Sequence, residues 1–166
     1  MGRFLEKMAS IFGSGDNLPW TDEDIIKSCE QETASEGAGL TEANDHSESI
    51  MRLAWALVHS HNPSDVQRGI AMLEASFANM MGPLQRRETL YLLAVGQFRA
   101  GDYSRSRRLV DQALQIAPEF RQAVALKKMV EEKIAKDGMI GVGLAVAAVG
   151  IVAGGIGVAA SLARKR

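Results

Sequence analysis

The chain has 166 residues, which suits one compact domain with short appendages and leaves little room for a second domain. Its single cysteine, Cys29, excludes a disulfide framework within the chain. The net charge of −1 is the sum of −8 over residues 1–50, +4 over 51–137 and +3 over 138–166. The basic residues of the middle part are interspersed with acids, so we expect no nucleic-acid-binding surface.

An N-terminal helical arm is predicted over residues 1–32. It has two apolar stripes at helical spacing, which comprise Phe4, Leu5, Met8, Ile11 and Phe12, and then Ile25, Ile26 and Cys29. Thr21 with Asp24 resembles a capping box at the start of the second helix. The acids at residues 22–24 favour the helix macrodipole, so we expect no cation site there. Cys29 is expected to be a core residue instead of a nucleophile.

Residues 33–47 are polar and small, with no apolar residue larger than leucine, and this composition predicts a mobile loop. Residues 48–86 then form a first tetratricopeptide-like unit, which is a looser copy of the unit that follows. Ser64 with Gln67 is expected to start its second helix. Five residues each lie 37 positions before their partners in the next unit: Leu53, Leu57, Gly69, Leu73 and Ser76.

Residues 87–120 form a second tetratricopeptide-like unit of 34 residues. Gly101 is expected to make the turn between its two helices, because glycine readily takes a positive φ at a helix end. Asp102 or Ser104 starts the second helix, and Pro118 stops it. The predicted helix crossing uses three small residues: Ala94, Ser106 and Ala113.

A capping helix is predicted over residues 119–137, with an apolar stripe made of Phe120, Ala123, Leu126, Val130 and Ile134. Two repeat units are fewer than the three that usually close a solenoid core. We therefore expect an all-α fold, in which the N-terminal arm and the capping helix cover the two ends of a tetratricopeptide-like helical bundle.

The C-terminal segment predicts a transmembrane anchor over residues 139–160. These 22 residues contain no charge and no hydroxyl, and as a helix they would span about 33 Å, enough to cross a bilayer once. Residues 161–166 form a basic tail that ends in Arg164, Lys165 and Arg166. Gly150 and Gly154 form a small-xxx-small pair, which favours self-association of the helix, although a pair of this kind also arises by chance in a glycine-rich segment.

A partner-binding groove is predicted on the first helix of each unit, on the face turned away from the second helix. This face is apolar and has an aromatic pair and one arginine, which suits an amphipathic helix or an extended segment. The alternative is that Tyr91 and Phe98 are ordinary core residues that cover the N-terminal arm. The groove residues are Met51, Ala54, Val58, Glu88, Tyr91, Val95, Phe98 and Arg99.

No chemistry-bearing constellation can be assembled from the remaining residues. His59 and His61 are two positions apart, so on a helix they would point to different faces and would not share one metal ion. Neither a glycine-rich phosphate loop nor a serine–histidine–aspartate arrangement is present. We expect a protein without enzyme activity, cofactor or metal.

Several segments resemble the mitochondrial fission 1 protein family. They are YLLAVG at residues 91–96, KDG at residues 136–138 before the apolar span, and the short basic tail. The stretches RLAWALVHSH and DVQRGIAMLEASF resemble the plant branch of that family. The resemblance covers nearly the whole chain outside residues 33–47.

This resemblance implies a tail-anchored adaptor of the mitochondrial outer membrane and the peroxisomal membrane, with its N-terminal domain in the cytosol. Such an adaptor helps to recruit a dynamin-related GTPase, directly or through adaptor proteins, for organelle fission. The resemblance also implies that the N-terminal arm can lie over the groove and regulate access to it.

Two other classes of protein stay open. One is a tail-anchored receptor for chaperones or import clients, but such receptors usually clamp a carboxylate with lysine and asparagine side chains, and Ala54 and Val58 stand where two of these would be expected. The other is a membrane anchor that oligomerises or shapes the membrane through residues 139–160 without recruiting a partner.

Overall fold

The structure is a computed structural model that describes residues 18–37, 43–78 and 82–138. Its five labelled helices are α2 (Glu23–Gly37), α3 (Ala43–Val58), α4 (Pro63–Phe77), α5 (Pro83–Arg99) and α6 (Tyr103–Ile116). A last helix, the capping helix, follows over residues 121–138. In the described ranges the only β-type pairing is an isolated bridge between Thr21 and Ser60, so the prediction of an all-α fold is confirmed.

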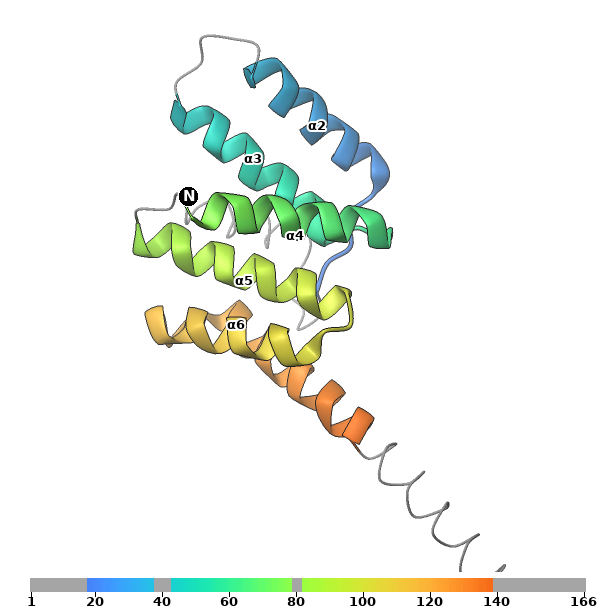
Figure 1. Cartoon of the computed structure of the whole chain (residues 1–166), viewed down its shortest axis with the longest axis vertical. Coiled ribbons are helices and arrows are strands. Elements are labelled where there is room, and N and C mark those ends of the chain that lie inside the picture. Colours follow the sequence, from blue (N-terminus) through green and yellow to red (C-terminus); the bar gives the residue numbers. More distant parts are fainter. Residues whose placement is uncertain (1–17, 38–42, 79–81, 139–166) are drawn as a thin grey trace, which may run out of the picture. The chain divides into compact units, whose positions relative to one another are not determined.

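Successive helices lie side by side: α2 packs on α3, α3 on α4, α4 on α5, and α5 on α6 (Figure 1). Helices α3 and α5, the first helices of the two predicted units, also contact each other. These contacts belong to a compact unit over Met1–Val130, and a second unit, Glu131–Arg166, begins within the capping helix.

The crossing of α5 and α6 has the small residues that the sequence predicts. Ala94 and Ser106 are fully buried, and the Ser106 hydroxyl donates a hydrogen bond of 2.7 Å to the Ala94 carbonyl. Gly101 turns the chain between the two helices with φ 85°, and the Asp102 carboxylate caps α6 by accepting from the Arg105 N–H at 2.9 Å. The predicted turn and the first of the two predicted helix starts are confirmed.

The crossing of α3 and α4 is tighter, and Gly69 is the residue that allows it. A Cβ atom at this position would lie 2.8 Å from Cγ1 of Val58, 2.9 Å from Cβ of Leu57 and 3.0 Å from the Val58 backbone nitrogen. The matching position in α6 is Ser106, whose side chain fits at the crossing of α5 and α6. At Gly69, by contrast, the backbones of α3 and α4 approach each other too closely for any side chain.

Two predicted helix starts are wrong. Helix α4 is capped by Asn62, whose side chain accepts from the Ser64 N–H at 3.0 Å, because Pro63 fits the first helical position and leaves Ser64 inside the helix. At the start of α2, the Thr21 hydroxyl has no hydrogen-bond partner among the described residues. The Thr21 N–H instead donates to the His59 carbonyl at 2.9 Å, which removes the predicted capping box.

The stretch predicted as a loop, residues 33–47, is helical at both ends. Helix α2 continues to Gly37, and α3 already begins at Ala43. The Thr33 hydroxyl donates to the Cys29 carbonyl one turn earlier at 2.8 Å, so this polar side chain bonds within the helix. The loop prediction is therefore wrong for residues 33–37 and 43–47, which belong to the ends of α2 and α3, and residues 38–42 lie outside the described residues.

The capping helix buries the predicted stripe in the first compact unit. Phe120, Ala123, Leu126 and Val130 are buried, whereas Ile134, in the second unit, is half-buried. Along the described ranges, no helix has the length and apolar character that a membrane crossing requires. The predicted anchor at 139–160 with its glycine pair, the basic tail, and the arm before residue 18 lie outside the described residues and stay predictions.

Candidate partner-binding face

The predicted groove residues lie on α3 and α5, and most of them are not exposed. Six are 7% exposed or less: Met51, Ala54, Val58, Glu88, Tyr91 and Val95. Phe98 and Arg99, near the end of α5, are half-buried. A partner can reach this face only if the parts of the chain that cover it move aside. The burial of Tyr91 agrees with the alternative interpretation, in which Tyr91 is a core residue.

An aromatic and charged cluster surrounds Tyr91. Its ring meets the Phe120 ring edge-on at a centroid distance of 5.1 Å, and the Arg87 guanidinium lies 4.8 Å from the centre of the same Phe120 ring. Arg87 also pairs with the buried Glu88 carboxylate at 3.2 Å. Burial raises the pKa of Tyr91, so its hydroxyl stays protonated. Arg87 was not among the predicted groove residues, although it directly precedes Glu88.

Arg99 is engaged within the chain itself. Its Nη2 donates to the carbonyls of Leu18 at 3.2 Å and Pro19 at 3.0 Å, and its Cζ lies 3.3 Å from the centre of the Trp20 ring. Burial lowers the pKa of Arg99 to about 10, which leaves the guanidinium charged at neutral pH. Arg99 therefore holds the segment before α2 against the end of α5.

Residues 18–21 are named the latch segment, and Arg99 contacts the first three of them. The His61 ring stacks on Trp20 at a centroid distance of 4.0 Å and an interplanar angle of 12°. Because two groups this close to one ring would overlap on the same face, His61 and Arg99 lie on opposite faces of Trp20. With the Thr21–His59 hydrogen bond, this three-layer stack ties the latch segment to the ends of α3 and α5.

His59 and His61 have different surroundings despite their spacing. His61 is exposed, whereas His59 is 1% exposed, stacks on Trp55 at 4.5 Å and donates from Nδ1 to the Trp55 carbonyl at 2.8 Å. Burial lowers the pKa of His59 to about 4, with a further contribution from the Arg99 charge.

Cys29 is half-buried, and burial raises the pKa of its thiol. A cysteine that acts as a nucleophile has a lowered pKa, so Cys29 does not have the environment of an activated thiol.

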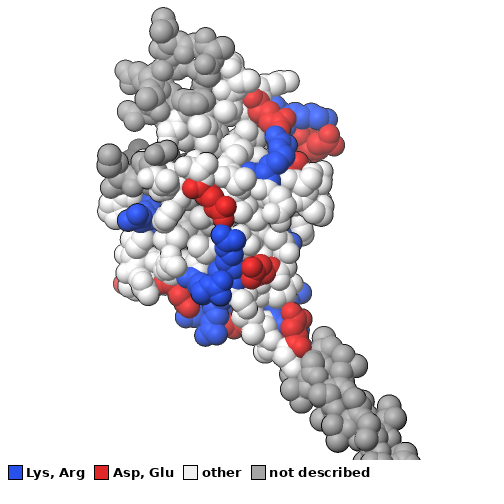
Figure 2. Space-filling model, in the orientation of Figure 1, with Lys and Arg blue, Asp and Glu red and all other residues white. Residues whose placement is uncertain are grey.

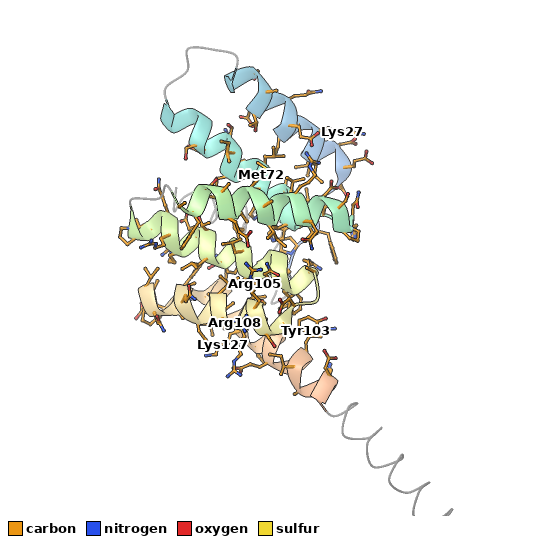
Figure 3. The ribbon with its side chains drawn as sticks, in the orientation of Figure 1. Lys27, Met72, Tyr103, Arg105, Arg108 and Lys127 are labelled. Atoms are coloured by element: carbon orange, nitrogen blue, oxygen red, sulfur yellow. The ribbon has the colours of Figure 1, made fainter. Side chains whose placement is uncertain are left out.

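Charged side chains of both signs alternate over α4, α6 and the capping helix (Figure 2). Figure 3 labels Arg105, Arg108 and Lys127 on this face. Ion pairs join separate helices: Arg68 to Glu30 at 2.7 Å, Arg105 to Glu74 at 2.6 Å, and Lys127 to Asp111 at 2.8 Å. This mixed pattern, with acids beside the bases, does not form the continuous basic stripe of a nucleic-acid-binding surface.

The two repeat units match family models. Residues 48–79 match the Fis1 N-terminal tetratricopeptide repeat, and residues 87–139 match the Fis1 C-terminal tetratricopeptide repeat. Mitochondrial fission 1 protein A of Arabidopsis thaliana is 49% identical to this chain, over 100% of this chain and 98% of the relative. The chain belongs to the mitochondrial fission 1 protein family. Protein B of the same plant is 50% identical over 93% of each chain, which supports the plant branch that the sequence indicated.

Solved structures of yeast Fis1 have the same fold as this family member. The crystal structure of yeast Fis1 in complex with an Mdv1 fragment superposes with a TM-score of 0.61 at 29% identity, over 72% of this chain and 89% of that one. Fis1 from Saccharomyces cerevisiae without that fragment gives the same TM-score over 73% of this chain and 89% of that one. The tetratricopeptide-like arrangement is confirmed, and the named relatives and the fold support a role in mitochondrial fission.

Proposed function

We propose that this chain is a tail-anchored adaptor that helps to recruit a dynamin-related GTPase, directly or through adaptor proteins, to mitochondria and peroxisomes for fission. Residues 139–160 would anchor it in the outer membrane, and the basic tail at 161–166 would contribute to targeting. The observation that carries the proposal is the likeness to yeast Fis1, whose crystal structure holds a fragment of Mdv1. Fluorescent localisation of the full chain, together with organelle length after its depletion, tests this placement.

The α3 and α5 face is the proposed binding surface. It combines small residues at Ala54 and Val58 with the aromatic side chains of Tyr91 and Phe98, so an apolar helix face or an extended segment can fill it. The same two small apolar residues offer no side chain that could clamp a terminal carboxylate, which argues against the chaperone-receptor alternative.

Truncation of both aromatic side chains tests this surface. The Tyr91→Ala and Phe98→Ala double variant is expected to lower GTPase recruitment to mitochondria about tenfold or more, because buried aromatic anchors dominate interfaces of this kind. The measurement is the fraction of GTPase that co-localises with mitochondria in depleted cells that express each variant.

Two controls separate lost binding from lost folding. Leu84→Ala with Val124→Ala removes the same kind of apolar surface from side chains that are 58% and 51% exposed, and it should leave recruitment unchanged. Phe98→Ala alone, at a half-buried position, should keep the wild-type circular dichroism while it lowers recruitment. Full recruitment by the folded double variant would remove the α3 and α5 face from the proposal.

We further propose that the N-terminal arm covers this face at rest and that the latch segment holds it there. Support comes from the three-layer stack of Arg99, Trp20 and His61, which fixes the described end of the arm at the ends of α3 and α5. An arm held in this way competes with a partner, so weakening the stack should favour binding.

Trp20→Ala is therefore expected to increase GTPase recruitment about threefold, since a cation–π contact and a ring stack are each worth about 1 kcal/mol and part of this is recovered by solvation. Faster exchange of the Thr21 amide, which donates to the His59 carbonyl, should accompany the change. His61→Ala, which removes one layer and keeps Arg99 on the ring, should give a smaller increase. Equal or lower recruitment in the Trp20 variant, despite faster exchange, would contradict the gating proposal.

A further inference from the structure

The latch segment lies in a site that other parts of the chain form. Figure 1 shows the chain running from the start of α2 toward the end of α5. Residues 18–20 are not helical, and Thr21 forms an isolated parallel bridge with Ser60. The groups that contact the segment belong to α5 and to the turn after α3, and they are named the latch site: the Arg99 guanidinium, the His59 carbonyl and the His61 ring.

Most hydrogen bonds between the latch site and the segment go to the backbone of the segment. Arg99 donates to the consecutive carbonyls of Leu18 and Pro19 at 3.2 and 3.0 Å, and the His59 carbonyl accepts from the Thr21 N–H at 2.9 Å. Backbone groups of this kind are present in every polypeptide. A segment of another protein can therefore make the same three hydrogen bonds, as in other sites that bind extended peptides through their main chain.

One side chain of the segment gives the site its selectivity. The Trp20 ring lies between Arg99, whose Cζ is 3.3 Å from the ring centre, and the His61 ring at 4.0 Å. A cation on one face and a planar ring on the other favour an aromatic side chain over an aliphatic one. The latch site thus combines main-chain recognition with a position for one aromatic ring.

The latch segment fits this site incompletely. Two buried polar atoms, Nε of Arg99 and Oγ1 of Thr21, have no hydrogen-bond partner among the described residues. Trp20 is 45% exposed even though both faces of its ring are covered. A buried hydroxyl without a partner weakens the contact that buries it. A segment with an apolar residue in place of Thr21 avoids this loss and can compete with the latch segment.

We propose that the latch site binds a partner protein through a short segment that replaces residues 18–21 and has the order aliphatic residue, proline, aromatic residue, β-branched apolar residue. The ring enters between Arg99 and His61, and proline lowers the entropy that binding costs because it restricts the backbone. Binding displaces the latch segment and opens the α3 and α5 face. The inference rests on the proposed gating of that face and names the chemistry of the segment that releases it.

A partner is favoured over a second copy of this chain as the occupant. A second copy offers only the segment that each chain already holds within itself, where the effective concentration is far higher than that of another molecule. It would also bury the same Thr21 hydroxyl without a partner. A foreign segment with a better fit has no such disadvantage.

Titration of the full chain in mild detergent with acetyl-Leu-Pro-Trp-Val-amide tests the proposal. Saturable chemical-shift changes are expected at the Thr21 amide and at the Arg99 Nε–H. Pro19→Gly with Trp20→Ala weakens the competing segment of the chain itself and should strengthen peptide binding about fivefold, a gain that a damaged fold cannot produce. Acetyl-Leu-Pro-Trp-Thr-amide should bind about fivefold more weakly than the valine peptide, and acetyl-Leu-Pro-Ala-Val-amide at least threefold more weakly.

Two arginine substitutions in the Pro19 and Trp20 double variant locate the binding site. Arg99→Lys should weaken binding of the valine peptide about fivefold, because a single ammonium group cannot reach two carbonyls and also cover a ring. Arg108→Lys is the matched control at an exposed arginine of α6, labelled in Figure 3, and it should change binding less than twofold. Both variants should keep the circular dichroism of their parent.

The proposal is overturned by a lack of saturable shifts in both parent chains, by equal binding of the tryptophan and alanine peptides, or by equal effects of the two arginine substitutions. A wild-type dimer with exchanged latch segments that excludes the peptide would also overturn it, in favour of a second copy as the occupant. Because the titration contains no GTPase, its failure leaves the recruitment proposal standing, and a failure of recruitment in cells leaves the peptide result unchanged.

Discussion

Replacement of Gly69 by valine is expected to lower the free energy of unfolding by about 3 kcal/mol. The atoms that a new Cβ would meet are the Cβ of Leu57 and the backbone nitrogen of Val58, at 2.9 and 3.0 Å, together with Cγ1 of Val58. Neither a backbone atom nor a Cβ can rotate away, so α3 and α4 must separate. The gain in helix propensity over glycine, about 0.5 kcal/mol, offsets only a small part.

Urea unfolding of the full chain in mild detergent measures this change. Ala71→Val is the matched control, because Ala71 lies two residues further along α4 and is exposed. It should cost no more than about 0.5 kcal/mol, the difference in helix propensity. Similar costs for the two variants would show that the close approach of α3 and α4 does not limit the size of residue 69.

Acidification is expected to destabilise the fold through His59 by up to about 3 kcal/mol. Its pKa is lowered from 6.5 to about 4 by burial, since the charged imidazolium has no solvent and no carboxylate partner in the contacts of this ring. In the unfolded chain the residue binds a proton near its ordinary pKa. Between these two values the unfolded state holds more protons than the folded one, so stability falls as the pH drops through this window.

His59→Gln isolates this contribution, because the glutamine amide can still donate to the Trp55 carbonyl but does not titrate. The variant should lose less stability than the wild type between about pH 6.5 and pH 4, and the two should run parallel above that window. The measurement is urea unfolding at several pH values. Parallel curves across the whole range would mean that another group causes the acid sensitivity.

The second repeat unit could be predicted in detail from the sequence because its signals are local. Gly101 takes the positive φ of the turn, Asp102 caps the following helix, and Ser106 meets Ala94 at the crossing. Gly101 and Asp102 act within three positions of themselves, and Ser106 meets a residue only twelve positions earlier, on the preceding helix of the same hairpin. The first unit is a looser copy, and there the cap fell on Asn62 because the Pro63 that follows fits the first turn better than Ser64 does.

The candidate site was predicted less well because its contacts are distant in the chain. Arg99 was expected to face a partner, but it binds carbonyl groups about eighty positions earlier, at Leu18 and Pro19, and no spacing rule reports such a contact. Helical periodicity placed Tyr91 and Val95 on one face correctly, yet periodicity cannot tell a groove from a covered surface.

The nearly linear order of helix contacts has a consequence for how the molecule opens. Apart from α3 with α5, each helix from α2 to α6 has its main contacts with the helices next to it in the chain. In such an array, stability is close to a sum of neighbour-to-neighbour terms, so one end can fray while the remainder stays folded. Separation of α2 would break its packing on α3 and the Arg68–Glu30 pair but leave the α5–α6 hairpin intact. Helix α2 can thus open reversibly as the end of the array while the second unit keeps its shape.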